Sequence, residues 1–341
     1  MKLDERFGLH GRHALVIGGG TGIGHAIARG LAQAGADVHL AARRAQVLEG
    51  ACLALRALGV DSRSFPVDAT DTAALRQLVA DVEQAVGVPD VLVNAQGVMS
   101  LKNAEDYDEA DYDRIMATNT KSVWFASTWF GQGMLARGSG CVINVASLAS
   151  YRGFARNGIY CMSKHAVRAL TETLASEWAG RGVRVNAIAP GFFMTDLNKD
   201  SMTADRKARA QSRIPMGRFG DVDELAGAAV YLASPAARYV TGATIAVDGG
   251  FLAAGGPADR GRAYVVGERG PELFVPRTSG TVVPAHKTGG TYYIDARGAD
   301  REGLARLESM IAQLHGSIEH RAVSAVLDAR QRGGSFTGAF A

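Results

Sequence analysis

Up to about residue 254, short apolar runs alternate with longer segments of helical pattern. The short runs show no polar alternation, as expected of strands that are buried on both faces of a parallel sheet. The alternation therefore predicts βαβ units and an α/β fold, a doubly wound parallel sheet of the Rossmann type with seven strands. The predicted strands are Ala14–Ile17, Val38–Ala41, Ser64–Val67, Val91–Val93, Cys141–Val145, Val183–Ile188 and Ala243–Val247. The predicted helices are Ile23–Ala34, Ala45–Leu58, Ala73–Val86, Tyr112–Leu135, Ser163–Ala179 and Glu224–Ala233.

The pattern changes after Phe251. Residues 255–341 hold four of the nine prolines together with paired glycines, which interrupts the alternation. We therefore expect a domain over residues 1–254 and a loosely structured extension over residues 255–341. Short β-prone pieces of the extension are Tyr264–Val266, Leu273–Val275 and Tyr292–Ile294. A final helix is predicted by an apolar seam that packs either on its own domain or against a partner helix. The seam consists of Leu304, Leu307, Ile311, Leu314 and Ile318.

Composition indicates a globular protein whose partner is a small molecule. Of the 341 residues, 47% are hydrophobic, enough for one large core and an appendage. The 37 basic and 34 acidic residues form no run of one sign, which argues against nucleic acid and membrane surfaces as partners. We expect neither a signal peptide nor a membrane span. Three cysteines without disulfide or metal-ligand spacing favour a reducing compartment, so we expect a cytoplasmic protein without a metal site.

A glycine-rich turn, Gly18 to Gly24, follows the first predicted strand and opens the first predicted helix. Glycines at such a place let the backbone approach a pyrophosphate, which then sits at the positive end of the helix. The spacing is Gly-x3-Gly-x-Gly, which differs from the common Gly-x-Gly-x-x-Gly. The position of the turn, first in the chain and between strand and helix, predicts a dinucleotide cofactor.

The end of the second predicted strand indicates which dinucleotide to expect. An acidic residue there would bind the ribose 2′-hydroxyl of NAD, but this stretch is Leu40-Ala41-Ala42-Arg43-Arg44. Arg43 and Arg44 can pair with a 2′-phosphate, so NADP(H) is favoured over NAD(H). The alternative is an ordinary solvated pair of arginines at the start of a helix.

Tyr160 and Lys164 form the strongest candidate for chemistry. Because they are four residues apart, their side chains share one face of a helix and can act on one bound molecule. Ser147 lies thirteen positions upstream. A tyrosine hydroxyl beside an ammonium group predicts a proton donor with its activator. Tyr151 is a rival, but no lysine follows it four residues later.

Together these residues resemble the short-chain dehydrogenase/reductase family. The likeness covers residues 7–254. Besides the glycine turn, Ser147, Tyr160 and Lys164, it is carried by Asn119, Asn186-Ala187-Ile188-Ala189-Pro190-Gly191 and Val247-Asp248-Gly249-Gly250. The chain departs from the family at Asn94-Ala95-Gln96-Gly97, where Asn-Asn-Ala-Gly is usual, and at Ile17, where Thr is common. The resemblance implies hydride transfer between NADP(H) and a carbonyl or secondary alcohol, by an enzyme that forms a homodimer or homotetramer.

The resemblance also implies roles for individual residues. Tyr160 would donate the proton, Lys164 would favour the phenolate and hold the nicotinamide ribose, and Ser147 would hydrogen-bond the carbonyl oxygen. Asn119 would complete a water-linked proton path. Cofactor contacts are expected from Gly18, Thr21, Gly22, Ile23, Gly24, Arg43, Asp68, Asn94, Gly97, Tyr160, Lys164, Pro190, Gly191 and Thr195. Asp68 has an alternative role as N-cap of the following helix, which Thr70 or Asp71 could equally supply.

Further resemblances concern the substrate and the extension. Residues 190–198 and 217–220 are similar to gluconate 5-dehydrogenase-like members, which act on sugar acids and polyols, and 3-oxoacyl carrier-protein reductases are the alternative. Residues 192–214 are expected to form the substrate lid. Val266-Gly267-Glu268-Arg269-Gly270-Pro271-Glu272-Leu273-Phe274-Val275-Pro276 and Ile294-Asp295-Ala296-Arg297-Gly298-Ala299-Asp300 resemble the end of bacteriophage tail tape-measure proteins, and the likeness spans most of residues 261–333. A gene fusion, or a joined reading of unrelated sequence, is the simpler explanation, and a phage-derived assembly protein with an incidental enzyme core is the second hypothesis. The intact set of four catalytic candidates favours the enzyme, because a scaffold has no need of it.

Overall fold

The computed structural model describes residues 2–195 and 204–253, followed by six short strands farther along the chain. The chain divides into two compact units, residues 1–250 and residues 251–341. All residues of the predicted site belong to the first unit. That residues 1–254 form an independent domain stays a prediction.

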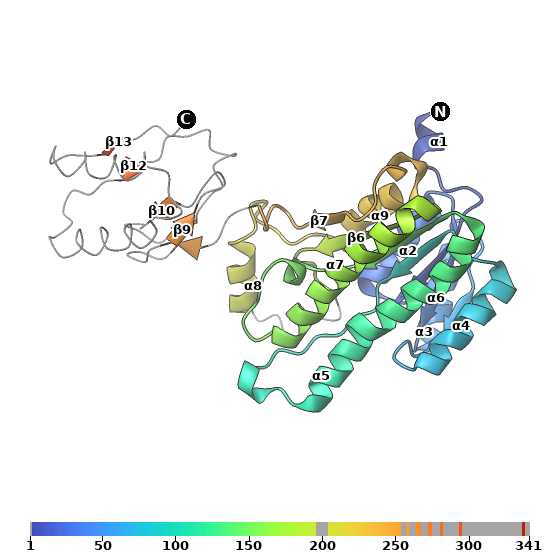
Figure 1. Ribbon diagram of the computed structural model, residues 1–341, viewed down its shortest axis with the longest axis horizontal. Coiled ribbons are helices and arrows are strands. Elements are labelled where there is room, and N and C mark those ends of the chain that lie inside the picture. Colours follow the sequence, from blue (N-terminus) through green and yellow to red (C-terminus); the bar gives the residue numbers. More distant parts are fainter. Residues whose placement is uncertain are drawn as a thin grey trace. The chain divides into compact units, whose positions relative to one another are not determined.

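Seven parallel strands form the sheet of the first unit (Figure 1). Their order is β3-β2-β1-β4-β5-β6-β7, so the chain starts in the middle, builds one edge and then returns to build the other. The predicted doubly wound α/β fold is confirmed, with one strand at each of the seven apolar runs. The strands are β1 (His13–Ile17), β2 (Asp37–Ala42), β3 (Ser64–Pro66), β4 (Val91–Asn94), β5 (Gly140–Val145), β6 (Val183–Pro190) and β7 (Thr244–Val247).

Helices cover both faces of this sheet. Residues of α2, α3 and α9 pack on one face, and residues of α4, α6 and α7 pack on the other (Figure 1). Because successive side chains of a strand point to opposite faces, Val16 joins the first core and Leu15 the second. The α-helices are α1 (Leu3–Phe7), α2 (Gly22–Gln33), α3 (Ala45–Arg56), α4 (Thr72–Val86), α5 (Glu109–Met116), α6 (Ser122–Arg137), α7 (Gly158–Trp178), α8 (Ala204–Gln211) and α9 (Ala226–Ala233). The short helical segments are η1 (Ala104–Asp106), η2 (Ala117–Lys121), η3 (Leu148–Ser150), η4 (Ala179–Arg181), η6 (Val222–Leu225) and η7 (Pro235–Ala237).

The helical pattern over Tyr112–Leu135 belongs to three consecutive elements. Helix α5 ends at Met116, a π-helix (η2) covers Ala117–Lys121, and α6 begins at Ser122. A single π-turn changes the hydrophobic period too little for the sequence to reveal it. Such turns occur frequently at functional sites, and Asn119 lies inside this one.

Helix α7 begins at Gly158, earlier than the predicted start at Ser163. Asn157 and Gly158 are turn-like residues, but Ile159 directly after them is buried and extends the apolar face of the helix. Tyr160 therefore lies inside the first turn of α7, one helical turn before Lys164. Tyr160 and Lys164 lie on one face of α7, as their four-residue spacing requires.

In the second unit, the structure describes three antiparallel strand pairs. Strand β9 (Tyr264–Val266) pairs with β10 (Glu272–Phe274), β8 (Pro257–Ala258) with β11 (Gly280–Thr281), and β12 (Tyr293–Ile294) with β13 (Phe336–Thr337). Strands β9, β10 and β12 fall on or beside the three β-prone pieces expected from the sequence. The predicted helix with the seam from Leu304 to Ile318 lies outside the described residues.

Candidate active site

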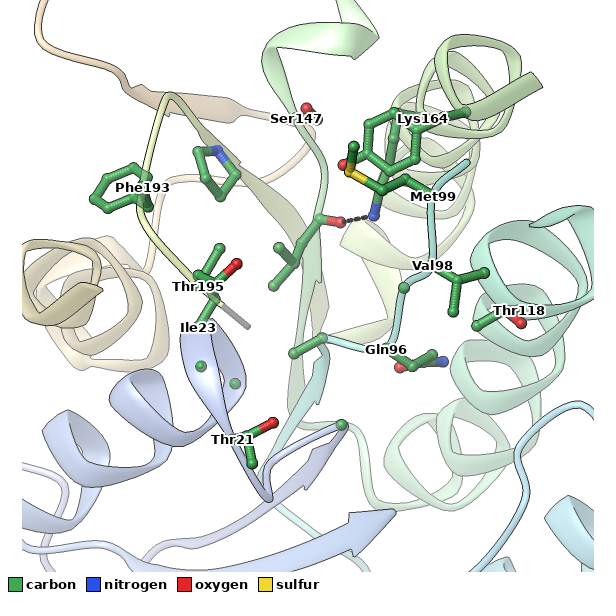
Figure 2. Close-up of a pocket in the computed structure, with 18 of the residues that line it drawn as sticks. Thr21, Ile23, Gln96, Val98, Met99, Thr118, Ser147, Lys164, Phe193 and Thr195 are labelled. Atoms are coloured by element: carbon green, nitrogen blue, oxygen red, sulfur yellow. Dashed lines mark hydrogen bonds between the residues drawn. The ribbon is translucent and has the colours of Figure 1, made fainter. Parts of the chain in front are cut away.

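A cavity of about 1070 Å³ opens at the carboxyl ends of the strands. The loops after β1, β2, β3, β4, β5 and β6 all contribute to its wall, as expected for ligand sites of doubly wound sheets. Figure 2 shows Thr21 and Ile23 of the glycine turn on one side of the cavity and Ser147 with Lys164 on another. The predicted site residues that line it are Gly18, Thr21, Gly22, Ile23, Gly24, Arg43, Asp68, Gly97, Ser147, Tyr160, Lys164, Pro190, Gly191 and Thr195. Asn94 and Asn119 do not line it.

The glycine turn brings β1, α2 and the segment after β4 too close together for side chains. A Cβ at Gly24 would lie 2.2 Å from the carbonyl oxygen of Gly18. A Cβ at Gly18, where φ is +82°, would lie 2.7 Å from the backbone nitrogen of Gln96. Gly22 has the opposite situation: φ is +55°, and the nearest atom to its Cβ position is Thr195 Cβ at 3.8 Å. A side chain at Gly22 would therefore project into the cavity.

At the end of β2, Arg43 and Arg44 are exposed and line the cavity together with Asp68, which follows β3. The backbone N–H and the hydroxyl of Thr70 donate to Asp68 Oδ1 over 2.9 and 2.7 Å. These bonds, and to a smaller extent the charge of Arg43, lower the pKa of the Asp68 carboxyl group. The N-cap of α4 is Asp71, which accepts from the backbone N–H groups of residues 73 and 74. Asp68 is thus not the helix cap and faces the cavity.

Ser147 follows β5 and begins the short helix η3, accepting a 3.1 Å hydrogen bond from the backbone of Ala149. Tyr160 comes from the start of α7 and is partly buried. Burial raises the pKa of the Tyr160 hydroxyl, and a hydrogen bond with Ser147 opposes that rise. The two hydroxyl groups therefore act at one point of the cavity wall. At neutral pH the tyrosine holds its proton.

Lys164 carries a buried ammonium group, with only 3% of the residue exposed. Its Nζ donates to the backbone carbonyl of Val145 over 2.8 Å (dashed line in Figure 2) and lies 5.8 Å from the centre of the Tyr160 ring. Burial lowers the pKa of Lys164 to about 8. The ammonium is consequently charged at neutral pH but loses its proton far more easily than a lysine at the surface.

Asn119 is fully buried, and its side chain holds two segments together. Its Oδ1 accepts from the N–H of Val98 over 2.8 Å, and its Nδ2 donates to the Val98 carbonyl over 2.9 Å. The same Nδ2 donates to Ser163 Oγ over 3.0 Å, and Ser163 Oγ donates to the Tyr160 carbonyl over 2.8 Å. The amide thus joins the π-helix to the loop after β4 and to α7. Sequence reasoning missed Ser163, whose position directly before Lys164 was the available signal.

Asn94 lies in the core, and its side chain does not reach the cavity. It ends β4, is 1% exposed, and donates from Nδ2 to Ser127 Oγ over 3.0 Å and to Asn144 Oδ1 over 2.9 Å. Asn144 in turn donates to Thr171 Oγ1 over 3.0 Å. This buried polar chain ties β4 and β5 to α6 and α7. The following residues Ala95, Gln96 and Gly97 line the cavity, and Figure 2 labels Gln96 there.

The predicted substrate lid contributes several residues to the cavity. Its described parts add Phe192, Phe193, Thr195, Arg209, Ala210, Ser212 and Arg213 to the lining. Residues 196–203 of the lid lie outside the described part of the chain. From the loop before α7 come Phe154, Ala155 and Asn157, which the sequence did not single out although they lie within six residues of Tyr160.

Within residues 2–195 and 204–253 and the short strands, no group of three or more His, Cys, Asp or Glu side chains is placed to hold a metal ion. No helix in this part of the chain combines the length and the apolar character needed to cross a membrane. Cys52, Cys141 and Cys161 are all buried and carry free thiols.

The family model described as enoyl-(acyl carrier protein) reductase matches residues 18–252, which include every described residue that lines the cavity except Ile17. The chain belongs to the short-chain dehydrogenase/reductase family. It is an oxidoreductase that acts on CH–OH groups. The match ends at residue 252, two residues after the end of the first unit.

Several relatives of this dehydrogenase/reductase are similar over almost their entire length. The 2-dehydro-3-deoxy-D-gluconate 5-dehydrogenase of Bacillus subtilis (strain 168) is 40% identical, over 73% of this chain and 98% of the relative. The galactitol 2-dehydrogenase (L-tagatose-forming) of Cereibacter sphaeroides is 42% identical, over 72% of this chain and 96% of the relative. The crystal structure of a gluconate 5-dehydrogenase from Burkholderia cenocepacia J2315, in complex with NADP and tartrate, is 35% identical with a TM-score of 0.72. That comparison covers 74% of this chain and 100% of the crystallised one.

Proposed function

We propose that this chain reversibly reduces a ketone on a sugar acid or polyol with NADP(H), in the manner of a gluconate 5-dehydrogenase. The observation that carries the proposal is the meeting of Ser147, Tyr160 and Lys164 at one point of the cavity wall. Relatives that act on 2-dehydro-3-deoxy-D-gluconate, gluconate and galactitol support the substrate class.

The cavity fits a dinucleotide phosphate. Gly22 leaves open the space that a side chain would fill, at the N-terminus of α2, where backbone N–H groups and the helix dipole favour a pyrophosphate. Arg43 and Arg44 would hold the 2′-phosphate. An acidic side chain at the end of β2 would repel this phosphate, and the structure describes none there. The NADP bound to the Burkholderia cenocepacia enzyme supports this preference. When bound, the nicotinamide supplies or accepts the hydride.

In the reductive direction, Tyr160 would donate its proton to the substrate carbonyl oxygen as negative charge develops there. The raised pKa of its hydroxyl keeps that proton in place until the charge develops. Ser147 would donate a hydrogen bond to the same oxygen, which stabilises the developing charge. The Lys164 ammonium would stabilise the phenolate that remains and contact the nicotinamide ribose. In the oxidative direction the same tyrosine would take the proton from the alcohol.

Asn119 would support this chemistry as a positioning residue. Its amide bonds are all made within the protein, to Val98 and Ser163, so its side chain holds α7 and the loop after β4 in register. A water-linked proton path would then start from its backbone, inside the π-helix. We further propose that the protein is cytoplasmic, as the spacing of its cysteines favours, and that it forms a homodimer or homotetramer, as the family resemblance implies.

Reduction of 3-oxoacyl carrier-protein substrates is the second candidate. The description of the matching family model, which names acyl carrier protein, favours it. The sugar-acid and polyol relatives favour the first candidate, because each is similar over at least 96% of its own length. A phage-derived assembly role would have to reside in residues 261–333, most of which lie outside the described part of the chain.

The test is a substrate panel assayed with NADPH and with NADH. It contains keto-sugar acids, neutral ketoses with their polyols, and 3-oxoacyl thioesters. We expect the highest kcat/KM for a keto-sugar acid or a ketose with NADPH. Preferred turnover of the thioester would establish the second candidate, and no turnover of any substrate by a protein that binds NADPH would refute the proposal.

A further inference from the structure

The described lining of the cavity carries more basic than acidic side chains. Among its described lining residues, five side chains are basic and one is acidic. The basic residues are Arg43, Arg44, Lys164, Arg209 and Arg213, and the acidic residue is Asp68. A cavity with this balance attracts anionic ligands and disfavours a cationic substrate. Arg43 and Arg44 are assigned above to the 2′-phosphate of the cofactor, and Lys164 is assigned to the stabilisation of the Tyr160 phenolate.

Arg209 and Arg213 lie on the side of the cavity opposite to the 2′-phosphate arginines. Residues after α8 are anchored beside the end of β7: Ile214 packs against Gly249, and Pro215 packs against Gly250. Arg43 and Arg44 follow β2. In the sheet, β2 is separated from β7 by four strands. With neighbouring strands about 4.8 Å apart, the two ends are separated by roughly 24 Å, too far to share one phosphate.

The α8 side is also the side of the proposed chemistry. Ser147 follows β5, and β5 is joined to β7 through β6 alone. Arg209 and Arg213 are four residues apart, and Ala210 and Ile214 beside them are buried. Arg209 lies on α8 and Arg213 follows the end of α8 by two residues, where the Arg213 N–H donates to the Ala210 carbonyl over 3.1 Å, so both guanidinium groups belong to one segment of the cavity wall. Ser212, which also lines the cavity, adds a hydroxyl group to the same segment.

We propose that Arg209 and Arg213 form a carboxylate subsite, which selects sugar acids over neutral polyols. The proposal rests on the function proposed above and specifies its substrate class. A guanidinium group presents two parallel N–H donors that match the two oxygens of a carboxylate. The acid would lie with its carboxylate at these arginines and its ketone at Ser147 and Tyr160. A neutral polyol can fill the same space but gains no charge-assisted hydrogen bond.

The test compares three single variants of the full-length protein with the parent: Arg209→Gln, Arg213→Gln and Lys207→Gln. Lys207 is the matched control, because it lies on α8 with Arg209 and carries the same charge as the two arginines. Its Nζ lies 6.0 Å from the centre of the Phe219 ring, and it does not line the cavity. Each protein is assayed with NADPH and two ketones, 5-ketogluconate and the neutral ketohexose fructose.

We expect either arginine variant to raise KM for 5-ketogluconate about 10-fold to 100-fold, the range for a lost hydrogen bond to a charged group. We expect KM for fructose, and kcat for both ketones, to stay near the parent values. Lys207→Gln should behave as the parent. Equal changes for the acid and the neutral ketone, or an equal effect of Lys207→Gln, would overturn the subsite.

A second measurement is independent of turnover. Tartrate and threitol differ in that two carboxylates replace two hydroxymethyl groups, and their binding to the NADPH complex is followed by nicotinamide fluorescence. We expect the parent to bind tartrate more tightly than threitol, and the arginine variants to lose that difference. A parent that prefers tartrate but turns over no ketone would contradict the proposed function alone, whereas unchanged tartrate binding in both arginine variants would contradict the subsite alone.

Discussion

The ammonium group of Lys164 donates a 2.8 Å hydrogen bond to the backbone carbonyl of Val145, which ends β5. The bond ties the catalytic helix α7 to the strand that delivers Ser147 two residues later. It also gives this almost completely buried charge a hydrogen-bond partner within the protein. The loss of water around the buried ammonium lowers the pKa of Lys164 to about 8.

The pH dependence of the enzyme should follow this lysine. Below a pH of about 8 Lys164 is charged, and above it the ammonium loses its proton. The pKa of Tyr160 is raised, so its hydroxyl stays protonated over the same range. We expect kcat/KM for NADPH in ketone reduction, which reports the free enzyme, to be level near pH 7 and to fall above about pH 8. A profile that stays level to pH 10 would show that the charge of Lys164 is not needed.

Tyr160→Phe should remove the proton donor while keeping the ring in place. We expect turnover to fall roughly 10²-fold to 10⁴-fold, with NADPH affinity close to that of the parent. Tyr151→Phe is the matched control, because the Tyr151 hydroxyl donates to the Thr244 carbonyl over 3.4 Å and belongs to the rival tyrosine. Near-normal turnover of Tyr160→Phe, or an equal loss in Tyr151→Phe, would refute the assignment.

Ala42→Asp should shift cofactor preference toward NAD(H). Ala42 lines the cavity directly before Arg43, so a carboxylate there would repel the 2′-phosphate and accept a hydrogen bond from a ribose hydroxyl. The measurement is the ratio of kcat/KM for NADPH to that for NADH. Ala57→Asp, at the exposed end of α3, adds the same charge away from the cavity and should leave the ratio unchanged. A parent enzyme that already prefers NADH would overturn the argument from Arg43.

Asn94→Ala should lower stability and leave cofactor binding unchanged. The variant removes the donor to Ser127 and Asn144, so buried acceptors lose a partner, at about 1–3 kcal/mol of unfolding free energy. Denaturant unfolding and NADPH titration separate the two effects. Thr128→Ala, which removes a hydrogen bond to Trp124 on the exposed side of α6, should change stability by less. Weakened NADPH binding with unchanged stability would restore Asn94 to the cofactor site.

Removal of residues 255–341 should preserve activity. Every residue that lines the cavity in the described part of the chain lies between Ile17 and Arg213. If the seam from Leu304 to Ile318 pairs with its copy in another subunit, and not with its own domain, light scattering should detect a change in association. Full-length and truncated proteins are compared side by side by scattering and kinetics. A truncated protein that folds and binds NADPH but has no turnover would place part of the catalytic apparatus in the extension.

The sequence was sufficient for the elements whose signal is local. The seven strands were predictable because a strand buried on both faces must be apolar throughout. Tyr160 and Lys164 were predictable as a pair because helical geometry alone brings residues four apart together. The π-helix around Asn119 and the early start of α7 at Gly158 were not predictable, because both depend on packing that overrides local turn preference.

The sequence by itself determined the doubly wound fold, the glycine turn and the residue types of the candidate chemistry, because these depend on periodicity and spacing along the chain. Only the tertiary structure decided what each side chain contacts. It placed Asn94 in the core and not in the cavity, gave the α4 cap to Asp71, and brought Arg209 and Arg213 to the cavity wall. These outcomes depend on contacts between residues far apart in the chain, such as Asn94 with Asn144. Such contacts cannot be predicted from the neighbouring sequence.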